Sequence, residues 1–100
     1  MNMQQMMAQA QKMQRELRKA QAELAEKEFT VTKGGAVTVV VLGSKQIKSV
    51  SIDADAFDAD NKEMVEDLIA LAINEALEQI EKESEAINER ITGQPGGFGI

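Results

Sequence analysis

The first quarter of the chain carries apolar residues at the spacing of one long helix. From Met3 to Leu24 they recur alternately three and four residues apart, and no glycine or proline interrupts the run. This a/d heptad spacing is typical of a helix with one narrow apolar seam. The seam consists of Met3, Met6, Ala10, Met13, Leu17, Ala20 and Leu24. A helix of about 26 residues is ~40 Å long, whereas a compact domain of this size has a radius of gyration of ~13 Å. We therefore expect the helix to extend beyond its own domain.

The central part of the chain predicts an antiparallel meander of three short strands. Residues 29–32, 36–42 and 45–52 are rich in β-branched side chains, and the turns Lys33-Gly34-Gly35 and Gly43-Ser44 separate them. Both faces of the middle strand are apolar, with Val37, Val39 and Val41 on one and Ala36, Val40 and Leu42 on the other. We expect both faces to be covered, which a single short chain achieves poorly.

A second helix of about 30 residues is predicted from the neighbourhood of Asn61. Asp60 and Glu63 stand three residues apart, the spacing of a capping box with Asp60 at the N-cap. The core face is broad and then continues as a thinner stripe through Ile87 and Ile91. Its main members are Val65, Leu68, Ile69, Ala72, Ile73, Ala76 and Ile80. Residues 1–92 are expected to form one domain, and residues 93–100, rich in glycine, a flexible tail.

These elements predict an α+β fold in the order helix, three-stranded antiparallel meander, helix. Both predicted helices are too long for the body that the strands can form. Their apolar seams need a partner, and the equivalent helices of a second chain would supply it. The pattern therefore predicts a homodimer with a sheet-based body and protruding helical arms.

Composition narrows the classes of function. The chain has no cysteine, histidine, tyrosine or tryptophan, so thiolate zinc sites and nucleophile pairs that use histidine cannot be built. We predict that the protein is not an enzyme and needs no cofactor. No apolar run is long enough to span a membrane and no secretion leader is evident, so a cytoplasmic protein without a membrane partner is expected.

The net charge of −6 is unevenly distributed along the sequence. Residues 1–50 hold eight Lys/Arg and four Asp/Glu, whereas residues 51–100 hold three and thirteen. The two halves therefore either perform different tasks or neutralise each other.

The most acidic stretch, "SIDADAFDADNKE" at residues 51–63, could be a metal site or only a corner between two elements. A calcium loop starting at Asp53 would place Asp58 where glycine is needed, and one starting at Asp58 would place Lys62 among the ligands. Neither frame fits, so no metal site is predicted. We interpret the stretch as a connection in which Phe57 packs into the body and Asp58 and Asp60 favour the start of a helix.

Several segments resemble one known family. They are "QAQKMQ" at Gln9–Gln14, "AVTVVVLG" followed by "VSID", "DNKEMVEDLIALAINEA" at Asp60–Ala76, and the tail "GQPGGFG". Together they resemble the YbaB/EbfC nucleoid-associated proteins over nearly the whole chain. The resemblance implies an α-β-β-β-α protomer, a tweezer-like homodimer, and binding of double-stranded DNA with little sequence selectivity. It also implies a place in the bacterial nucleoid and a role in nucleoid organisation or gene regulation.

The first predicted helix supplies the positive charge that DNA binding needs. Lys12, Arg15, Arg18 and Lys19 span an arc of ~120° nearly opposite the seam. We predict that these four residues contact DNA phosphates, and we regard Lys33, Lys45 and Lys48 as secondary candidates. Two other interpretations remain open: the four side chains are only solvated, or they pair with the distal acids of the second helix, Glu78, Glu81, Glu83, Glu85 and Glu89.

An alternative function follows from the methionines of the first helix. Met1, Met3, Met6 and Met7 cluster near its start, and methionine adapts to varied apolar surfaces. The protein would then be a dimeric interaction module that binds a protein partner through its arm tips. The purely structural explanation is that these residues form the end of the apolar seam between the two chains of the dimer.

Overall fold

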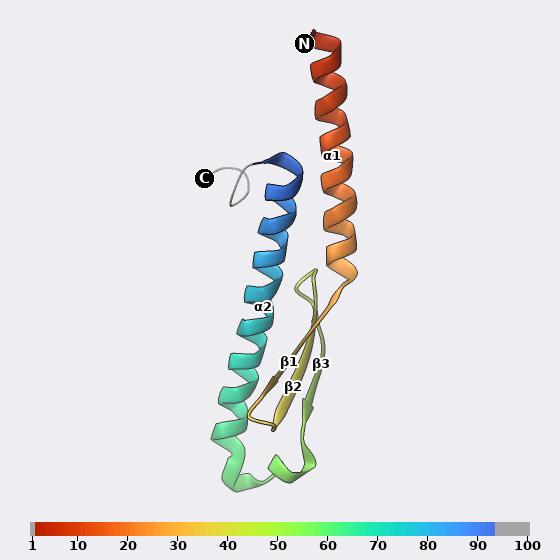
Figure 1. The fold of residues 1–100 in the computed structure, drawn as a ribbon. Helices are drawn as coiled ribbons and strands as arrows, with labels where there is room; N and C mark the ends of the chain where they lie inside the picture. Colours follow the sequence, from red (N-terminus) through yellow and green to blue (C-terminus); the bar gives the residue numbers. More distant parts are fainter. Residues whose placement is uncertain (1, 94–100) are drawn as a thin grey trace.

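The computed structural model describes residues 2–93, and its elements follow the predicted order (Figure 1). Helix α1 is Met3–Glu26 and helix α2 is Lys62–Thr92. Between them, strands β1 (Glu28–Lys33), β2 (Val37–Leu42) and β3 (Ile47–Ile52) form one antiparallel sheet in the order β1-β2-β3. The predicted fold class, α+β with a helix–meander–helix order, is confirmed. The predicted tail after Gly93, which caps α2, lies outside the described residues and stays a prediction.

The protomer is strongly elongated. Its principal extents are 69 × 23 × 16 Å and its radius of gyration is 19.0 Å, compared with the ~13 Å typical of a compact domain of this size. Helix α2 runs along the sheet and then beside the lower part of α1, whose N-terminal part projects alone beyond the end of α2 (Figure 1). The expectation that the first helix extends beyond its own domain is therefore confirmed.

The core lies between α2 and one face of the sheet. Val39 and Val41 of β2 and Ala72 and Ala76 of α2 are fully buried, with Ile80 beside them. Each buried valine or isoleucine contributes ~1.5–3 kcal/mol when it leaves water. Helix α2 packs on β1 and β2, and this packing explains the alternating burial of β2, in which Val37, Val39 and Val41 face the helix.

The two helices meet along the end of α1 and the second half of α2. Leu24 and Ile87 are buried there, and Leu17, Ala20 and Ile91 pack against them. The Gln21 side-chain amide donates a hydrogen bond to Asn88 Oδ1 at 3.2 Å. Only the second half of the predicted seam is therefore covered within the protomer.

The outer face of β2 lies on the side of the sheet opposite α2. Thr38, Val40 and Leu42 point away from α2 and are half-buried, and α2 is the only helix in the described part of the chain that packs extensively on the sheet. The sheet of the protomer thus has a helix layer on one side only, and the coverage of the other face, which was not expected from a single chain, stays a prediction.

The acidic stretch forms the corner between β3 and α2, as interpreted, but α2 begins later than expected and has a different cap. Two short 3₁₀ turns, Ala54–Ala56 and Ala59–Asn61, fill the corner. Asp58 caps the second turn by accepting a hydrogen bond from the Asp60 backbone N–H at 2.9 Å. The N-cap of α2 is Asn61, without a side-chain cap. The predicted Asp60–Glu63 capping box is therefore wrong, because the extra turn moves the helix start past Asp60.

Phe57 was expected to pack into the body, and this prediction is wrong. Its side chain is 80% exposed. It stands over an apolar groove of about 540 Å³ whose walls include Ile52, Val65 and Ile69. The groove exists because α2 covers β1 and β2 and leaves the apolar side of β3 open.

Candidate nucleic-acid interface

The candidate interface is the N-terminal part of α1 and the basic residues that follow it. We call residues 2–14 the overhang, because α2 ends opposite the next turns of α1: Ile91 lines the same shallow hollow as Glu16 and Ala20. Every residue from 2 to 12 is exposed. A capping box begins the helix, with the Asn2 side chain accepting from the Gln5 N–H at 2.8 Å and the Gln5 side chain accepting from the Asn2 N–H at 3.2 Å. Only local interactions therefore hold the overhang helical.

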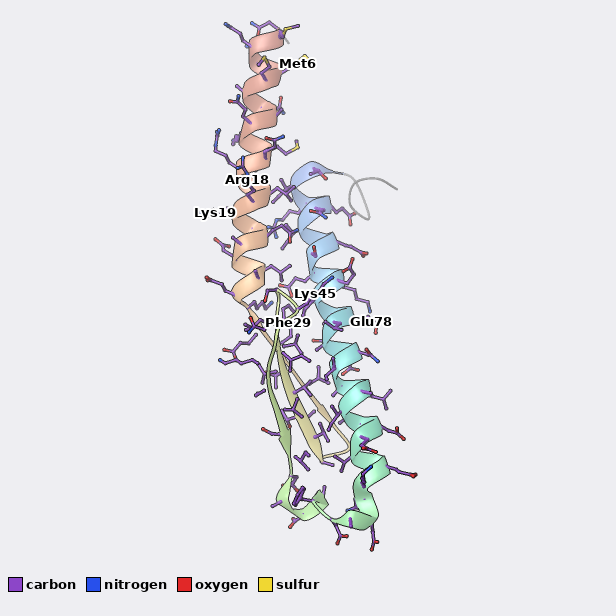
Figure 2. The ribbon with its side chains drawn as sticks, turned by 180° about the vertical axis from the view of Figure 1, so that it is seen from behind. Met6, Arg18, Lys19, Phe29, Lys45 and Glu78 are labelled. Carbon is purple, nitrogen blue, oxygen red and sulfur yellow. The ribbon has the colours of Figure 1, made fainter. Side chains whose placement is uncertain are left out.

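The four predicted DNA-binding residues lie on α1, where the overhang meets the paired part of the helix. Lys12, Arg15, Arg18 and Lys19 are all exposed, and Figure 2 shows Arg18 and Lys19 near the level at which α2 ends. Lys12 approaches Glu16 at 4.0 Å along the helix. Within residues 2–93, no carboxylate lies within ion-pair distance of Arg15, Arg18 or Lys19.

Three of the five distal acids of α2 pair with other lysines. Glu83 accepts from Lys27 Nζ at 2.6 Å, Glu81 lies 3.5 Å from Lys45, and Glu78 lies 3.9 Å from Lys82 on its own helix. Neutralisation of the basic residues of α1 by the distal acids, one of the open interpretations, is thus not the arrangement within the protomer. Each of these exposed pairs contributes only ~0–1 kcal/mol to the free energy of folding. Their main effect is that these acids are occupied by lysines other than the four candidates.

The secondary candidates are all engaged in ion pairs. Lys33 Nζ lies 2.9 Å from Glu75 and Lys48 Nζ lies 2.9 Å from Glu28, while Lys45 pairs with Glu81. A phosphate would have to compete with a carboxylate at each of these lysines. They are weaker candidates than the three unpaired cations of α1.

One cation near the interface is not among the candidates from the sequence. Arg90, in the last turn of α2, lines the same shallow hollow as Lys19, together with Glu16 and Glu23. A basic residue in this position is normally explained by the helix dipole, so the sequence offered no signal for a second role. The structure brings it within the region where α1 emerges from the body.

The acidic corner shows no arrangement suited to a cation. In the described part of the chain, no three acidic side chains come close enough together to hold a metal ion. Across the same residues, no helix combines the length and the apolarity needed to cross a bilayer.

Fold and charge together define a small α+β protein whose first helix projects from the body and carries four exposed basic residues. Residues 1–95 match the YbaB/EbfC DNA-binding family, and the chain belongs to this family. The family description is DNA binding and names no catalytic activity.

Individual relatives agree with this assignment. The chain is 45% identical to a nucleoid-associated protein of Clostridium novyi, over 98% of this chain and 90% of that one. It is 51% identical to a nucleoid-associated protein of Lachnospira eligens, over 79% and 69% of the two chains. The fold matches the crystal structure of uncharacterized protein HP0035 from Helicobacter pylori with a TM-score of 0.77, at 19% identity and over 93% and 99% of the two chains.

Proposed function

We propose that this protein is a nucleoid-associated protein that binds duplex DNA through α1, with little sequence selectivity. The observation that carries the proposal is the set of unpaired cations Arg15, Arg18 and Lys19 at the base of a freely projecting helix. Lys12 completes the proposed contact set. Phosphate contacts of this kind position a protein on DNA without reading its sequence. The proposed location is the nucleoid of the bacterial cytoplasm, with a role in nucleoid organisation or gene regulation.

Charge distribution explains how a protein of net charge −6 could bind a polyanion. The acids of the corner lie at the other end of the elongated protomer from the overhang, and those of α2 are spread along a helix that ends beside the lower part of α1, so none lies on the overhang itself (Figure 1). Repulsion between these acids and the phosphates would keep the body away from the duplex and direct α1 toward it. Exposed charges further apart than ~8–10 Å are largely screened at physiological salt, so the acids repel a duplex only where it approaches the body.

We further propose that the protein is a homodimer, formed through the open apolar side of β3. The strand register places Ile52 opposite Val37 and Val50 opposite Val39, so these side chains belong to the face that α2 covers elsewhere. They remain 37% and 43% exposed, and Ile47 is 47% exposed. Adjacent exposed apolar side chains of this size mark an interaction surface. Phe57 and its groove extend the same surface toward the corner.

A second copy of the chain is the occupant that best suits this surface. In a two-fold contact the same patch meets itself, so an exposed Phe57 on each protomer finds an open apolar groove on the other. The dimer would carry two projecting arms and would double the number of phosphate contacts. Two arms on one body give the tweezer-like shape that the family resemblance implies.

The test of DNA binding is fluorescence anisotropy with a random-sequence 30-base-pair duplex, titrated from low to physiological salt. If several phosphates are neutralised, the log-log plot of affinity against salt has a slope of about −4 or steeper. Lys12→Glu with Arg15→Glu should abolish binding and leave the circular dichroism spectrum unchanged. Lys82→Glu is the matched control for the single variant Arg15→Glu, because it makes the same change of net charge at an exposed residue of α2 outside the proposed contacts. Absence of binding by the unaltered protein at low salt would refute the proposal.

The alternative, a module that binds a protein partner through its arm tips, has one observation in its favour. Met3, Met6 and Met7 are 76%, 58% and 56% exposed, and Figure 2 shows Met6 near the free end of α1. Met3→Ser with Met6→Ser separates the two functions. The double variant should bind DNA as the unaltered protein does if α1 binds DNA through its cations. Loss of a cellular function with intact DNA binding would instead favour the partner.

A further inference from the structure

We infer that the overhang enters the major groove of the duplex and that Gln4, Gln11 and Gln14 contact base edges there. This inference rests on the DNA binding proposed above and adds the part of the DNA that is contacted and the residues that read it. The helical arm, which consists of α1 and the end of α2 beside it, changes in width along its length.

Only the overhang is narrow enough for a groove. It is a single helix with no neighbour on any side from residue 2 to residue 12, and such a helix is ~10–12 Å across with its side chains. The major groove is ~12 Å wide and ~8.5 Å deep. From Leu17 onward α1 lies beside α2, and two packed helices with axes ~8–10 Å apart are about 20 Å across. The paired part of the arm must therefore stay outside, and the basic residues at its start would meet the phosphates of the groove rim.

The overhang also lacks charges that would oppose entry. Residues 2–11 carry no ionisable side chain, so no carboxylate is brought close to the phosphates. The first cation is Lys12, followed by Arg15, at the position where the arm widens. The overhang can thus enter the major groove while the cations contact phosphates at the same time.

One face of the overhang presents amide groups. Gln4, Gln11 and Gln14, together with Met7 and Arg18, recur alternately three and four residues apart and fall within an arc of ~80°. This face is distinct from the seam of Met3, Met6, Ala10 and Met13. No side-chain hydrogen bond occupies the three amides within the described residues. In contrast, Gln5 is used in the helix cap and Gln21 bonds to Asn88.

The chemistry of this face suits A·T base pairs in the major groove. In a bidentate pair, the N–H of a glutamine amide donates to N7 of adenine while the amide oxygen accepts from the N6 amino group, and an apolar side chain contacts the thymine methyl group. Met7 lies between Gln4 and Gln11 and would supply that apolar contact. The expected result is a modest preference for A·T-rich duplexes superimposed on phosphate binding that does not depend on sequence.

The decisive experiment blocks the groove without changing the charge. The full-length protein is titrated by anisotropy against a 30-base-pair duplex of mixed sequence and against the same duplex in which every cytosine carries a glucosylated hydroxymethyl group, which fills the major groove. Affinity should fall about tenfold or more on the modified duplex. Binding that is equal within about twofold would overturn groove entry and leave the proposed function intact. Failure to bind even the unmodified duplex would overturn both.

A set of variants then tests the named residues. In Gln4→Ala/Gln11→Ala/Gln14→Ala, affinity for an A·T-rich duplex should fall about fivefold or more, while the salt slope stays unchanged because the cations remain. Gln9→Ala is the matched control, since Gln9 lies in the same free segment but on another side of the helix. Alanine favours helix, so circular dichroism should show no loss of structure. A triple variant that discriminates A·T-rich from G·C-rich duplexes as the unaltered protein does, or an unaltered protein that does not discriminate them at all, would overturn the role of the glutamines.

Discussion

Gly43 shows how one residue fixes the junction between the arm and the body. It follows β2, and its N–H donates to the Lys27 carbonyl at 2.9 Å, while the next N–H, of Ser44, donates to the Ala25 carbonyl at 3.1 Å. The β2–β3 turn is thereby tied to the end of α1. A Cβ atom at position 43 would lie 1.7 Å from the Leu24 carbonyl oxygen. Only glycine allows the turn and the helix end to approach so closely.

Replacing Gly43 by alanine should therefore destabilise the fold. The clash is with backbone atoms of Leu24, which cannot rotate away, so the turn or the helix end must move. We expect the free energy of unfolding to fall by about 2–3 kcal/mol, measured by urea denaturation. Gly35→Asn is the control: nothing lies within 4 Å of a Cβ there, and asparagine tolerates the left-handed backbone at φ 63, so the change should stay within about 1 kcal/mol. Equal effects of the two substitutions would show that the close approach does not constrain the fold.

The residues that the sequence misjudged are those whose environment depends on the placement of a whole element. The sequence predicts that Phe57 packs into the body, as large apolar side chains usually do, yet it is exposed because α2 leaves β3 uncovered. Asp60 has a good N-cap side chain, but a 3₁₀ turn that Asp58 caps comes first. The local sequence pattern correctly predicted a corner between two elements. It could not predict the path of the chain through that corner.

Helix α1 has two parts with different sources of stability. From Leu17 to Glu26 it packs on α2 and is anchored by Leu24. The overhang has no tertiary contact and relies on its own hydrogen bonds and on the Asn2–Gln5 capping box. Isolated helices shorter than ~12–15 residues are marginal in water. The overhang therefore depends on continuity with the anchored part.

Hydrogen exchange should reveal this division. We expect backbone amides of residues 6–11 to exchange about a hundredfold faster than those of residues 18–24, because fraying opens the overhang without unfolding the body. Amides of β2 serve as the reference for global unfolding. When a 30-base-pair duplex is added, protection should rise in the overhang. Uniform protection along α1 in the free protein would mean that another surface covers the overhang.

The sequence predicted the elements well because each has a strong local signal. The seam of α1 keeps its heptad spacing over three repeats, and β2 is nearly continuous in β-branched residues. The prediction stopped short of how the elements share surfaces. Nothing in the spacing of Val65, Ile69 or Ile73 indicates that α2 covers two strands rather than three. The unpaired state of Arg15 and Arg18 was likewise undecided, because it depends on where the acids of α2 point.

In the whole protomer, the proposed dimer surface and the proposed DNA-binding residues lie in different places. The apolar surface of Ile47, Val50, Ile52 and Phe57 lies on the body, and the basic residues lie on the arm. This separation allows a dimer to form through the bodies while both arms stay free for DNA. Binding by two linked arms is stronger than binding by one because the second contact becomes intramolecular.

Breaking the dimer should therefore weaken DNA binding without touching a basic residue. Ile52→Asp places a charge in the proposed interface, and it should leave the protomer folded because the side chain is already partly exposed. Light scattering after size exclusion should show the mass of a dimer for the unaltered protein and of a monomer for the variant. The salt slope of DNA binding should fall to about half, since one arm neutralises half as many phosphates.

Ser51→Asp is the matched control, because Ser51 is the neighbouring exposed residue on the opposite face of β3. A monomeric Ile52→Asp variant with an unchanged slope would show that each arm binds DNA independently of the dimer. If the unaltered protein is itself monomeric, the proposed dimer is refuted, and DNA binding by α1 is then tested by the anisotropy titration alone.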